Sequence, residues 1–315
     1  MCLEIDAIIQ PGYISFLLIF SNILLINRSS IHIINIFLIY DIYIYMKKYI
    51  FLLVILILFI ILIHLKKTGL LETFNNFDKK NYLCLLCVKL SPELLTFAKQ
   101  LSIHHKIFIM VDNNDTKLPN IIDNINILQM DDQECINLGY KNASATLKKN
   151  PVTWDKVFYY FSNIDTNFNH IWFVEEDVFV PTFDYFSKLD QKYPNIDLIC
   201  KNHIAHKTDK QQWHWSRAKG NIPKPWFRSI LCCHRQSRRN LQKVKEYVQK
   251  NGKLLFLEFL INTLASHNNH SVKTLPEFKT ITWRNKIDEN NININNLYHP
   301  VKDLKKHLEY RKRIQ

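Results

Sequence analysis

Short apolar runs alternate with segments of helical period between residues 83 and 266, and this alternation constrains the fold more than any other feature of the sequence. Buried strands are expected where short apolar runs end at turn-forming or acidic residues. Such runs occupy residues 83–88, 106–111, 125–129, 170–174 and 196–200. Because helical segments lie between the runs, the sequence predicts a three-layer α/β domain with a largely parallel central sheet. In such a sheet the ligand site lies at the carboxyl ends of the strands.

Capping residues mark the ends of the helices. Ser91-Pro92-Glu93 supplies an N-cap, a first-turn proline and an acid, which predicts a helix that runs to about Leu101. Thr153 is predicted to cap a second helix through the sequence WDKVFYYF. Residues 236–266 predict one or two helices divided at Asn251-Gly252.

Glycine is scarce in this chain. The 315 residues include five glycines, and no two of them lie near each other. Gly-rich phosphate loops, the dinucleotide-binding fingerprint and the G-x-S-x-G nucleophile elbow all need clustered glycines for tight backbone turns. These motifs are therefore excluded, and any nucleotide must be held by other means.

The formal net charge is +13, and all of the excess lies after residue 65. A positive field of this size attracts nucleic acid, anionic lipid or phosphorylated small molecules alike. The alternative is a solvated lysine-rich surface with no particular partner.

Residues 49–65 read YIFLLVILILFIILIHL and have two lysines on each side. Seventeen helical residues span about 26 Å, close to the lower limit for crossing a bilayer. A secretory signal peptide would have a shorter apolar region and a small-residue cleavage site. The run therefore predicts an uncleaved transmembrane signal anchor. The usual arrangement would be a single-pass type II protein with its catalytic domain in the lumen of the ER or Golgi, or in a viral equivalent.

The expected domain organisation follows from this anchor. Residues 1–45 are apolar and of low complexity, and they represent either a start codon placed too far upstream or an additional hydrophobic hairpin. Residues 46–67 form the anchor, 68–80 a polar stem, 81–302 the catalytic domain and 303–315 a basic tail.

Seven cysteines do not form a persuasive metal motif. Cys84-x-x-Cys87 lies in an apolar run, where residues three apart on a strand point to opposite faces, so core packing is favoured. Cys232-Cys233-His234 could be half of a metal site, but it lacks the C-x-x-C spacing.

Three acids follow the apolar run at 170–174: Glu175, Glu176 and Asp177. An apolar strand that ends in three acids is costly unless the acids face solvent or a cation. Glu175 and Asp177 project on one side if the strand continues, while Glu176 points the opposite way. Two carboxylates at a sheet edge suit a hard divalent ion that takes its other ligands from a substrate diphosphate. The alternative is an exposed acidic corner without a ligand.

WDKVFYYF followed by HIWFVEEDVFVP, within residues 154–181, resembles the segment of GT-A-type glycosyltransferases in which a helix precedes the strand carrying the DxD metal-binding motif. Outside this segment the resemblance, from Leu83 to about Lys302, is one of element order. It implies a GT-A-like, Rossmann-related fold. It also implies that Asp177 binds Mn²⁺ or Mg²⁺ on the diphosphate of a nucleotide sugar, with Glu175 or Glu176 contacting metal, ribose or sugar. A glutamate stands where the usual motif has its first aspartate.

The resemblance extends to two further residues, and a lysine follows closely after one of them. Asp112 would lie where such enzymes touch the nucleoside, and His299 is the candidate that completes the metal shell. Lys302 would neutralise the leaving diphosphate, or it belongs to the basic tail.

Glu258 is a lone acid in the apolar sequence LLFLEFLINTLA. Burial raises the pKa of a carboxyl group, so Glu258 could act as the general base for an acceptor hydroxyl. The alternative is a helix glutamate that faces solvent or pairs with Arg238 or Arg239.

These observations predict a membrane-anchored, metal-assisted glycosyltransferase that moves a sugar from a nucleotide-diphosphate donor to a glycan, protein or lipid hydroxyl. No nucleic-acid partner is expected. One alternative is a metal-dependent phosphoryl-transfer or nuclease-like enzyme that uses the same acids and the basic surface. The other is a catalytically inactive, membrane-tethered binding module.

Overall fold

The computed structural model describes residues 43–57, 59–60, 63, 81–144, 150–164, 168–208, 213–217, 221–284 and 287–314. The chain divides into two units, Met1–Asn75 and Asn76–Gln315. In the first unit, residues 43–57 are helical and their side chains are exposed. Among the residues that the structure describes, no helix combines the length and the apolar character needed to cross a membrane. The part of the predicted N-terminal extension up to residue 42 lies outside the described residues, as do residues 58, 61–62 and 64–67 of the predicted anchor and the stem at 68–80.

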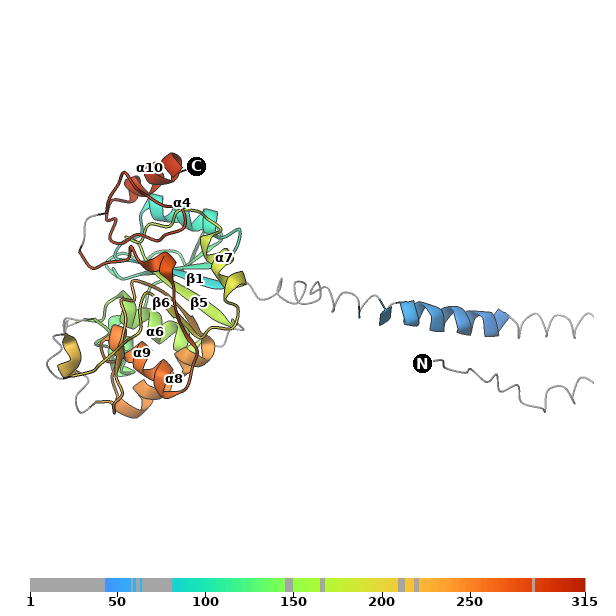
Figure 1. Ribbon diagram of the computed structural model, residues 1–315, viewed down its shortest axis with the longest axis horizontal. Helices are drawn as coiled ribbons and strands as arrows, with labels where there is room; N and C mark the ends of the chain where they lie inside the picture. The colour runs from blue at the N-terminus through green and yellow to red at the C-terminus, as the bar shows by residue number, and fades with distance from the viewer. Residues whose placement is uncertain are drawn as a thin grey trace, which may run out of the picture. The chain divides into compact units, whose positions relative to one another are not determined.

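The second unit is built on an eight-stranded sheet in the order β10-β6-β9-β5-β1-β2-β4-β3 (Figure 1). Neighbouring strands are parallel except β9, which is antiparallel to β5 and β6, and β3, which is antiparallel to β4. The prediction of an α/β domain with a mostly parallel sheet is therefore confirmed. The strands are β1 (Tyr82–Cys87), β2 (Lys106–Val111), β3 (Ile121–Ile122), β4 (Ile125–Leu128), β5 (His170–Glu175), β6 (Leu198–Cys200), β9 (Cys233–Ser237) and β10 (Val272–Thr274). A separate ladder pairs β7 (Ile204–Ala205) with β8 (Phe227–Arg228).

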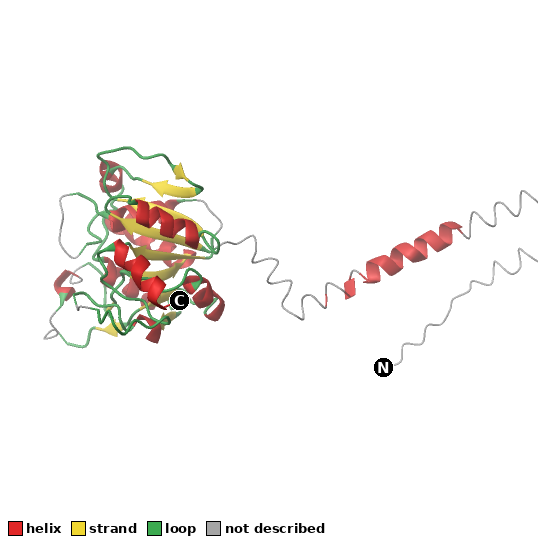
Figure 2. Ribbon diagram, turned by 90° about the horizontal axis from the view of Figure 1, so that it is seen from above, coloured by secondary structure: helices red, strands yellow, loops and turns green. Residues whose placement is uncertain are grey.

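Helices cover both faces of the sheet (Figures 1 and 2). One face carries α6 (Thr153–Asn163), α8 (Arg238–Asn251) and α9 (Leu257–His267), and the other carries α4 (Pro92–Leu101), α7 (Tyr185–Lys192) and α10 (Leu304–Ile314). The remaining helical turns are α5 (Asp132–Asn137), η1 (His214–Arg217) and η2 (Pro276–Phe278).

Alternate residues of the central strand β1 pack into two different cores. Cys84 and Leu86 face one core, whereas Leu85 and Cys87 face the other. A parallel strand buried on both faces is apolar at every position, which accounts for the unbroken apolar run of β1. Cys84 and Cys87 thus belong to opposite cores, as predicted.

Helix α4 begins as predicted, because Ser91 Oγ accepts a hydrogen bond from Leu94 N at 3.1 Å. The prediction that Thr153 caps α6 is wrong. Val152 occupies the N-cap position, and the carboxylate of Asp155 reaches back to accept from Val152 N at 2.8 Å. The other oxygen of Asp155 accepts from Ala143 N at 2.8 Å, so this one side chain fixes both the start of α6 and the preceding loop.

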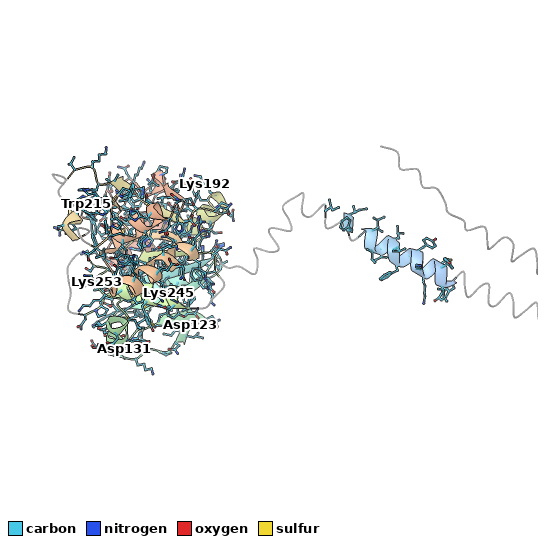
Figure 3. The ribbon with its side chains drawn as sticks, turned by 90° about the horizontal axis from the view of Figure 1, so that it is seen from below. Asp123, Asp131, Lys192, Trp215, Lys245 and Lys253 are labelled. Carbon is cyan, nitrogen blue, oxygen red and sulfur yellow. The ribbon has the colours of Figure 1, made fainter. Side chains whose placement is uncertain are left out.

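The segment expected as a basic tail forms α10, which contacts α4. Arg311 of α10 is buried, donates to the Val180 carbonyl at 2.9 Å and lies 4.6 Å from the ring centroid of Phe97. Other cations project from the surface of this unit, among them Lys192, Lys245 and Lys253 (Figure 3).

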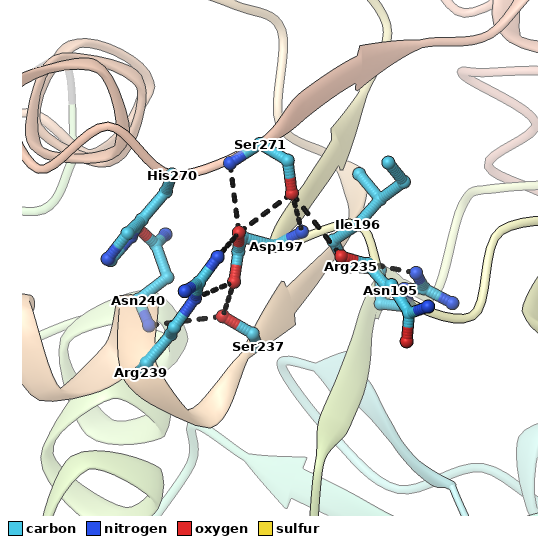
Figure 4. Close-up of polar contacts among 9 residues, drawn as sticks. All are labelled: Asn195, Ile196, Asp197, Arg235, Ser237, Arg239, Asn240, His270 and Ser271. Carbon is cyan, nitrogen blue, oxygen red and sulfur yellow. Dashed lines mark hydrogen bonds and ion pairs between the residues drawn. The ribbon is translucent and has the colours of Figure 1, made fainter.

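Asp197 ties together the edge of the sheet beyond β9 (Figure 4). This buried carboxylate accepts from Ser271 N at 2.9 Å, from Ser271 Oγ at 2.7 Å and from Ser237 Oγ at 2.8 Å. It also forms an ion pair with Arg239. Asp197 precedes β6, Ser237 ends β9 and Ser271 precedes β10. The fully hydrogen-bonded carboxylate of Asp197 therefore joins three strands.

Candidate functional site

The three acids lie where the order of the sheet reverses. β2 and β4 extend the sheet on one side of β1, while β5 and the later strands extend it on the other. Ligands of open α/β sheets bind outside the carboxyl ends of the strands at such a switch point. Glu175 ends β5, and Glu176 and Asp177 follow it directly.

A cavity of about 350 Å³ opens at this point. It is bounded by the end of β1, the start of α6, the three acids and one lysine: Leu86, Cys87, Val88, Val152, Thr153, Trp154, Glu175, Glu176, Asp177 and Lys302. The start of α6 brings backbone N–H groups and the positive end of a helix dipole to the rim. The cavity thus combines acids that suit a cation with positive groups that suit an anion.

His299 faces Glu175 and Asp177. Its Nε2 lies 3.2 Å from Asp177 Oδ1 and 3.5 Å from Glu175 Oε2. Its Nδ1 lies 2.6 Å from the Thr282 carbonyl oxygen, which can only accept, so Nδ1 carries a proton and donates. Backbone bridges from Tyr298 to Phe179 and from His299 to Ile281 hold the ring in this place.

The residues present fit a divalent cation. Burial alone would lower the pKa of His299, but hydrogen bonds with Asp177, Cys232 and Glu175 raise it above its usual value. A positive charge is thus favoured between these side chains, where a proton or a cation can supply it. Histidines that bind metals commonly donate their other ring N–H to a carbonyl, as His299 does to Thr282. Glu175, Asp177 and His299, which the sequence predicted as metal ligands, are brought together.

Trp154 orients Glu175, and the sequence analysis did not identify it as a site residue. Its Nε1 donates to Glu175 Oε1 at 2.6 Å. Its ring stacks on His234 with centroids 5.3 Å apart. An aromatic residue at the start of an amphipathic helix is typical of core packing, so no local signal marks Trp154 as functional.

The alternation expected for Glu175, Glu176 and Asp177 required the strand to continue, but β5 ends at Glu175 and residues 176–177 form a turn. Glu176 Oε1 accepts from Val88 N at 3.3 Å, which joins the ends of β5 and β1. Burial, followed by the nearby charges of Asp177 and Glu175, raises the pKa of Glu176. Lys302 lies on the cavity wall.

Asp112 lies at the end of β2, beside β1, but it does not line the cavity. Lys156 Nζ lies 3.2 Å from Asp112 Oδ1, 2.6 Å from the Asp112 carbonyl oxygen and 2.8 Å from Asp132 Oδ1. The Asp112 carboxylate is therefore paired with a buried lysine. A nucleoside that contacted Asp112 would have to share this carboxylate with Lys156.

Glu258 is buried in the first turn of α9 and does not line the cavity. Its Oε1 accepts from Leu231 N at 3.4 Å, and its Oε2 has no hydrogen-bond partner among the described residues. Burial raises the pKa of Glu258 well above its usual value. The charge of Glu175 also raises the pKa of Glu258, and that of His299 lowers it.

Cys232 is the second site residue that the sequence analysis did not include. Its thiol lies beside Glu175 and His299, and donor atoms of the three residues lie within 4.8 Å of one another. The signal in the sequence was the Cys-Cys-His run, which lacks metal-ligand spacing because the partners of Cys232 come from distant segments of the chain.

A larger hollow of about 620 Å³ lies between α7 and residues 276–279 and 294–296. Its only acid among the described lining residues, Glu277, is paired with Lys192 at 3.1 Å. It offers no convergent set of reactive groups, so the smaller cavity at the switch point is the candidate site.

No protein-family model matches this chain, and no curated protein matches it. Among solved structures, the chain is similar to the crystal structure of 4-diphosphocytidyl-2C-methyl-D-erythritol synthase from Anaerococcus prevotii. The TM-score is 0.38 and the sequence identity is 8%, over 76% of this chain and 97% of that chain. The function proposed below therefore depends on the geometry of the site and not on this likeness.

Proposed function

We propose that this chain is a metal-assisted glycosyltransferase that takes its sugar from a nucleotide-diphosphate donor. The observation that supports the proposal is the convergence of Glu175, Asp177 and His299 on one point at the carboxyl end of β5. This point adjoins a cavity with a lysine and a helix N-terminus on its wall. A diphosphate needs positive groups, and a cation between two carboxylates supplies them without a Gly-rich loop.

Each of these residues has a distinct part in the proposed mechanism. Glu175, Asp177 and His299 would hold Mn²⁺ or Mg²⁺, which when bound neutralises charge on a departing diphosphate. Trp154 fixes the direction of the Glu175 carboxylate, and Thr282 fixes the ring of His299. Lys302 and the first-turn N–H groups of α6 would pair with phosphate oxygens. The acceptor is proposed to be a glycan, protein or lipid hydroxyl.

The test is turnover by the full chain in detergent with a panel of UDP- and GDP-sugars and Mn²⁺, measured as release of nucleoside diphosphate. Asp177→Asn should lower the rate on the order of 100-fold or more. The reason is that the negative charge on the departing diphosphate loses the cation that neutralises it in the transition state. The matched control is Asp303→Asn, an exposed aspartate whose carboxylate accepts from the backbone N–H of Lys305 at 2.9 Å. Equal rates in the Asp177 variant and the wild type, or no release from any donor, would contradict the proposal.

We also propose Glu258 as the proton acceptor for the incoming hydroxyl. The support is its electrostatic coupling to Glu175 and His299 together with its unpaired Oε2. Glu258→Gln keeps an acceptor for Leu231 N but removes the base. Loss of transfer with unchanged nucleotide binding is expected, and full activity of this variant would rule out the role.

We further propose that residues 49–65 anchor the chain as a single-pass type II membrane protein with a lumenal catalytic unit. The support is the apolar run with flanking lysines and the exposed apolar side chains of residues 49–57. Leu56→Arg places a charge at the middle of the run, which costs about 2.5–3.5 kcal/mol in membrane insertion. Carbonate extraction should release this variant and not the wild type, and release of both would contradict an anchor.

A further inference from the structure

A thiol lies among the oxygen and nitrogen donors of the site. The β5–β9 ladder pairs Val174 with Cys233, and Glu175 N donates to the Cys232 carbonyl oxygen at 2.9 Å. Cys232 therefore lies opposite Glu175, one step beyond the last pair of an antiparallel ladder. Side chains directly opposite each other in such a ladder are close neighbours.

The second segment that approaches Cys232 carries His299, which forms an isolated backbone bridge with Ile281. Donor atoms of Glu175, Cys232 and His299 all lie within 4.8 Å of one another. Four donors around one zinc-like ion, at about 2.0 Å for nitrogen or oxygen and about 2.3 Å for sulfur, lie roughly 3.3–3.7 Å apart. The three donors seen here, within 4.8 Å of one another, would move closer by up to about 1–1.5 Å to reach that spacing.

Cys232 differs from the other described cysteines in its surroundings. All six of them are free and buried. Cys84 and Cys87 pack among apolar side chains, and Cys200 contacts a backbone carbonyl and the amide of Asn262. Cys232 packs in the same core as Cys87, but its thiol also adjoins an imidazole and a carboxylate, a combination that metal sites use.

We propose that Cys232 is a ligand of the cation in this site, together with Glu175, Asp177 and His299. This inference rests on the cation site of the proposed function and narrows the choice of ion. Carboxylates and water suit Mg²⁺, whereas a thiolate suits borderline ions. The site is therefore expected to rank Zn²⁺, Co²⁺ and Mn²⁺ above Mg²⁺. Binding displaces the thiol proton to solvent, and the sulfur–metal bond forms in its place.

The test is absorption spectroscopy of the full chain in detergent, titrated with Co²⁺ under reducing conditions. A thiolate ligand produces a near-ultraviolet sulfur-to-cobalt charge-transfer band, which oxygen and nitrogen ligands do not. The band should appear in the wild type and disappear in Cys232→Ser. The matched control is Cys200→Ser, which replaces another buried thiol with polar neighbours and should keep the band.

Competition with Zn²⁺ and Mg²⁺ gives a second readout. Loss of a residue that only orients a metal ligand typically weakens metal affinity by about 10–100-fold. Cys232→Ser removes a ligand itself, so it should weaken Zn²⁺ binding by at least this factor. Its effect on Mg²⁺ binding should be much smaller. Circular dichroism of each variant establishes that it is folded.

The outcomes separate this inference from the proposed function. Co²⁺ binding without the band in the wild type, or a band that persists in folded Cys232→Ser, would overturn the role of Cys232 and leave the carboxylate–histidine site standing. Absence of any divalent-cation binding would overturn both.

Discussion

At the scale of single residues, the site depends on side chains that each make two contacts. Glu175 accepts from Trp154 and faces His299, and His299 donates to Thr282 while facing two carboxylates. The sequence predicted Glu175 and Asp177 because acids at the end of an apolar strand suit a cation, and the resemblance to GT-A-type glycosyltransferases added His299. Trp154 and Cys232 have ordinary core explanations, and only their spatial neighbours assign them to the site.

Trp154→Phe tests whether orientation of Glu175 matters. Phenylalanine can keep the ring contact with His234 but cannot donate to Glu175 Oε1. Loss of such an outer-shell donor should weaken cation affinity by about 10–100-fold. The measurement is Mn²⁺ titration of the full chain, followed by electron paramagnetic resonance of the free ion.

The control for this prediction is Trp226→Phe. Trp226 Nε1 donates to the Ile222 carbonyl at 3.0 Å, so this variant loses the same kind of hydrogen bond away from the acids. Its Mn²⁺ affinity should equal that of the wild type. Equal losses in both variants would mean that general loosening of the fold, and not Glu175 orientation, weakens the cation site.

At the scale of elements, the apolar runs predicted β1, β2, β4, β5 and β6 to within two residues at each end. They did not predict β9. This strand reads CHRQS, and its polar residues His234, Arg235 and Gln236 are all buried. Each has a polar partner, such as Asp190 for Arg235 at 2.5 Å. A buried strand made of paired polar residues has no hydrophobic pattern, so its antiparallel place between β5 and β6, which positions Cys232, was not predictable.

Acid should weaken the sheet edge held by Asp197. Burial would raise the pKa of this carboxyl group, but bonds from Arg239, Ser271 and Ser237 outweigh burial and lower it well below its usual range. A carboxyl group with a depressed folded-state pKa stabilises the fold above the unfolded pKa of about 3.9, and this stabilisation is lost as the pH falls below it.

Urea unfolding of the full chain between pH 6 and pH 3, followed by circular dichroism, measures this contribution. Asp197→Asn should lose about 2–3 kcal/mol at pH 6 and should show a shallower fall in stability towards pH 3. Asp115→Asn, in an exposed loop, serves as the control and should follow the wild type. An Asp197 variant whose acid slope equals that of the wild type would show that this network is not the acid-sensitive element.

At the scale of the whole molecule, the chain combines a mostly parallel α/β unit with an apolar N-terminal run. Fold class follows from the alternation of elements, because period and capping are local properties of the sequence. Strand order and the meeting of β5, β9 and residues 298–299 depend on contacts between distant segments. A single sequence contains no direct record of those contacts.

The central claim is that a divalent cation couples the acids after β5 to a nucleoside diphosphate. Calorimetric titration of the full chain with UDP and GDP, with and without Mn²⁺, tests this coupling directly. We expect that at least one nucleotide binds only in the presence of Mn²⁺. This binding should be lost in Asp177→Asn and unchanged in Asp303→Asn. Nucleotide binding of equal affinity without any divalent cation, or in the Asp177 variant, would contradict the claim.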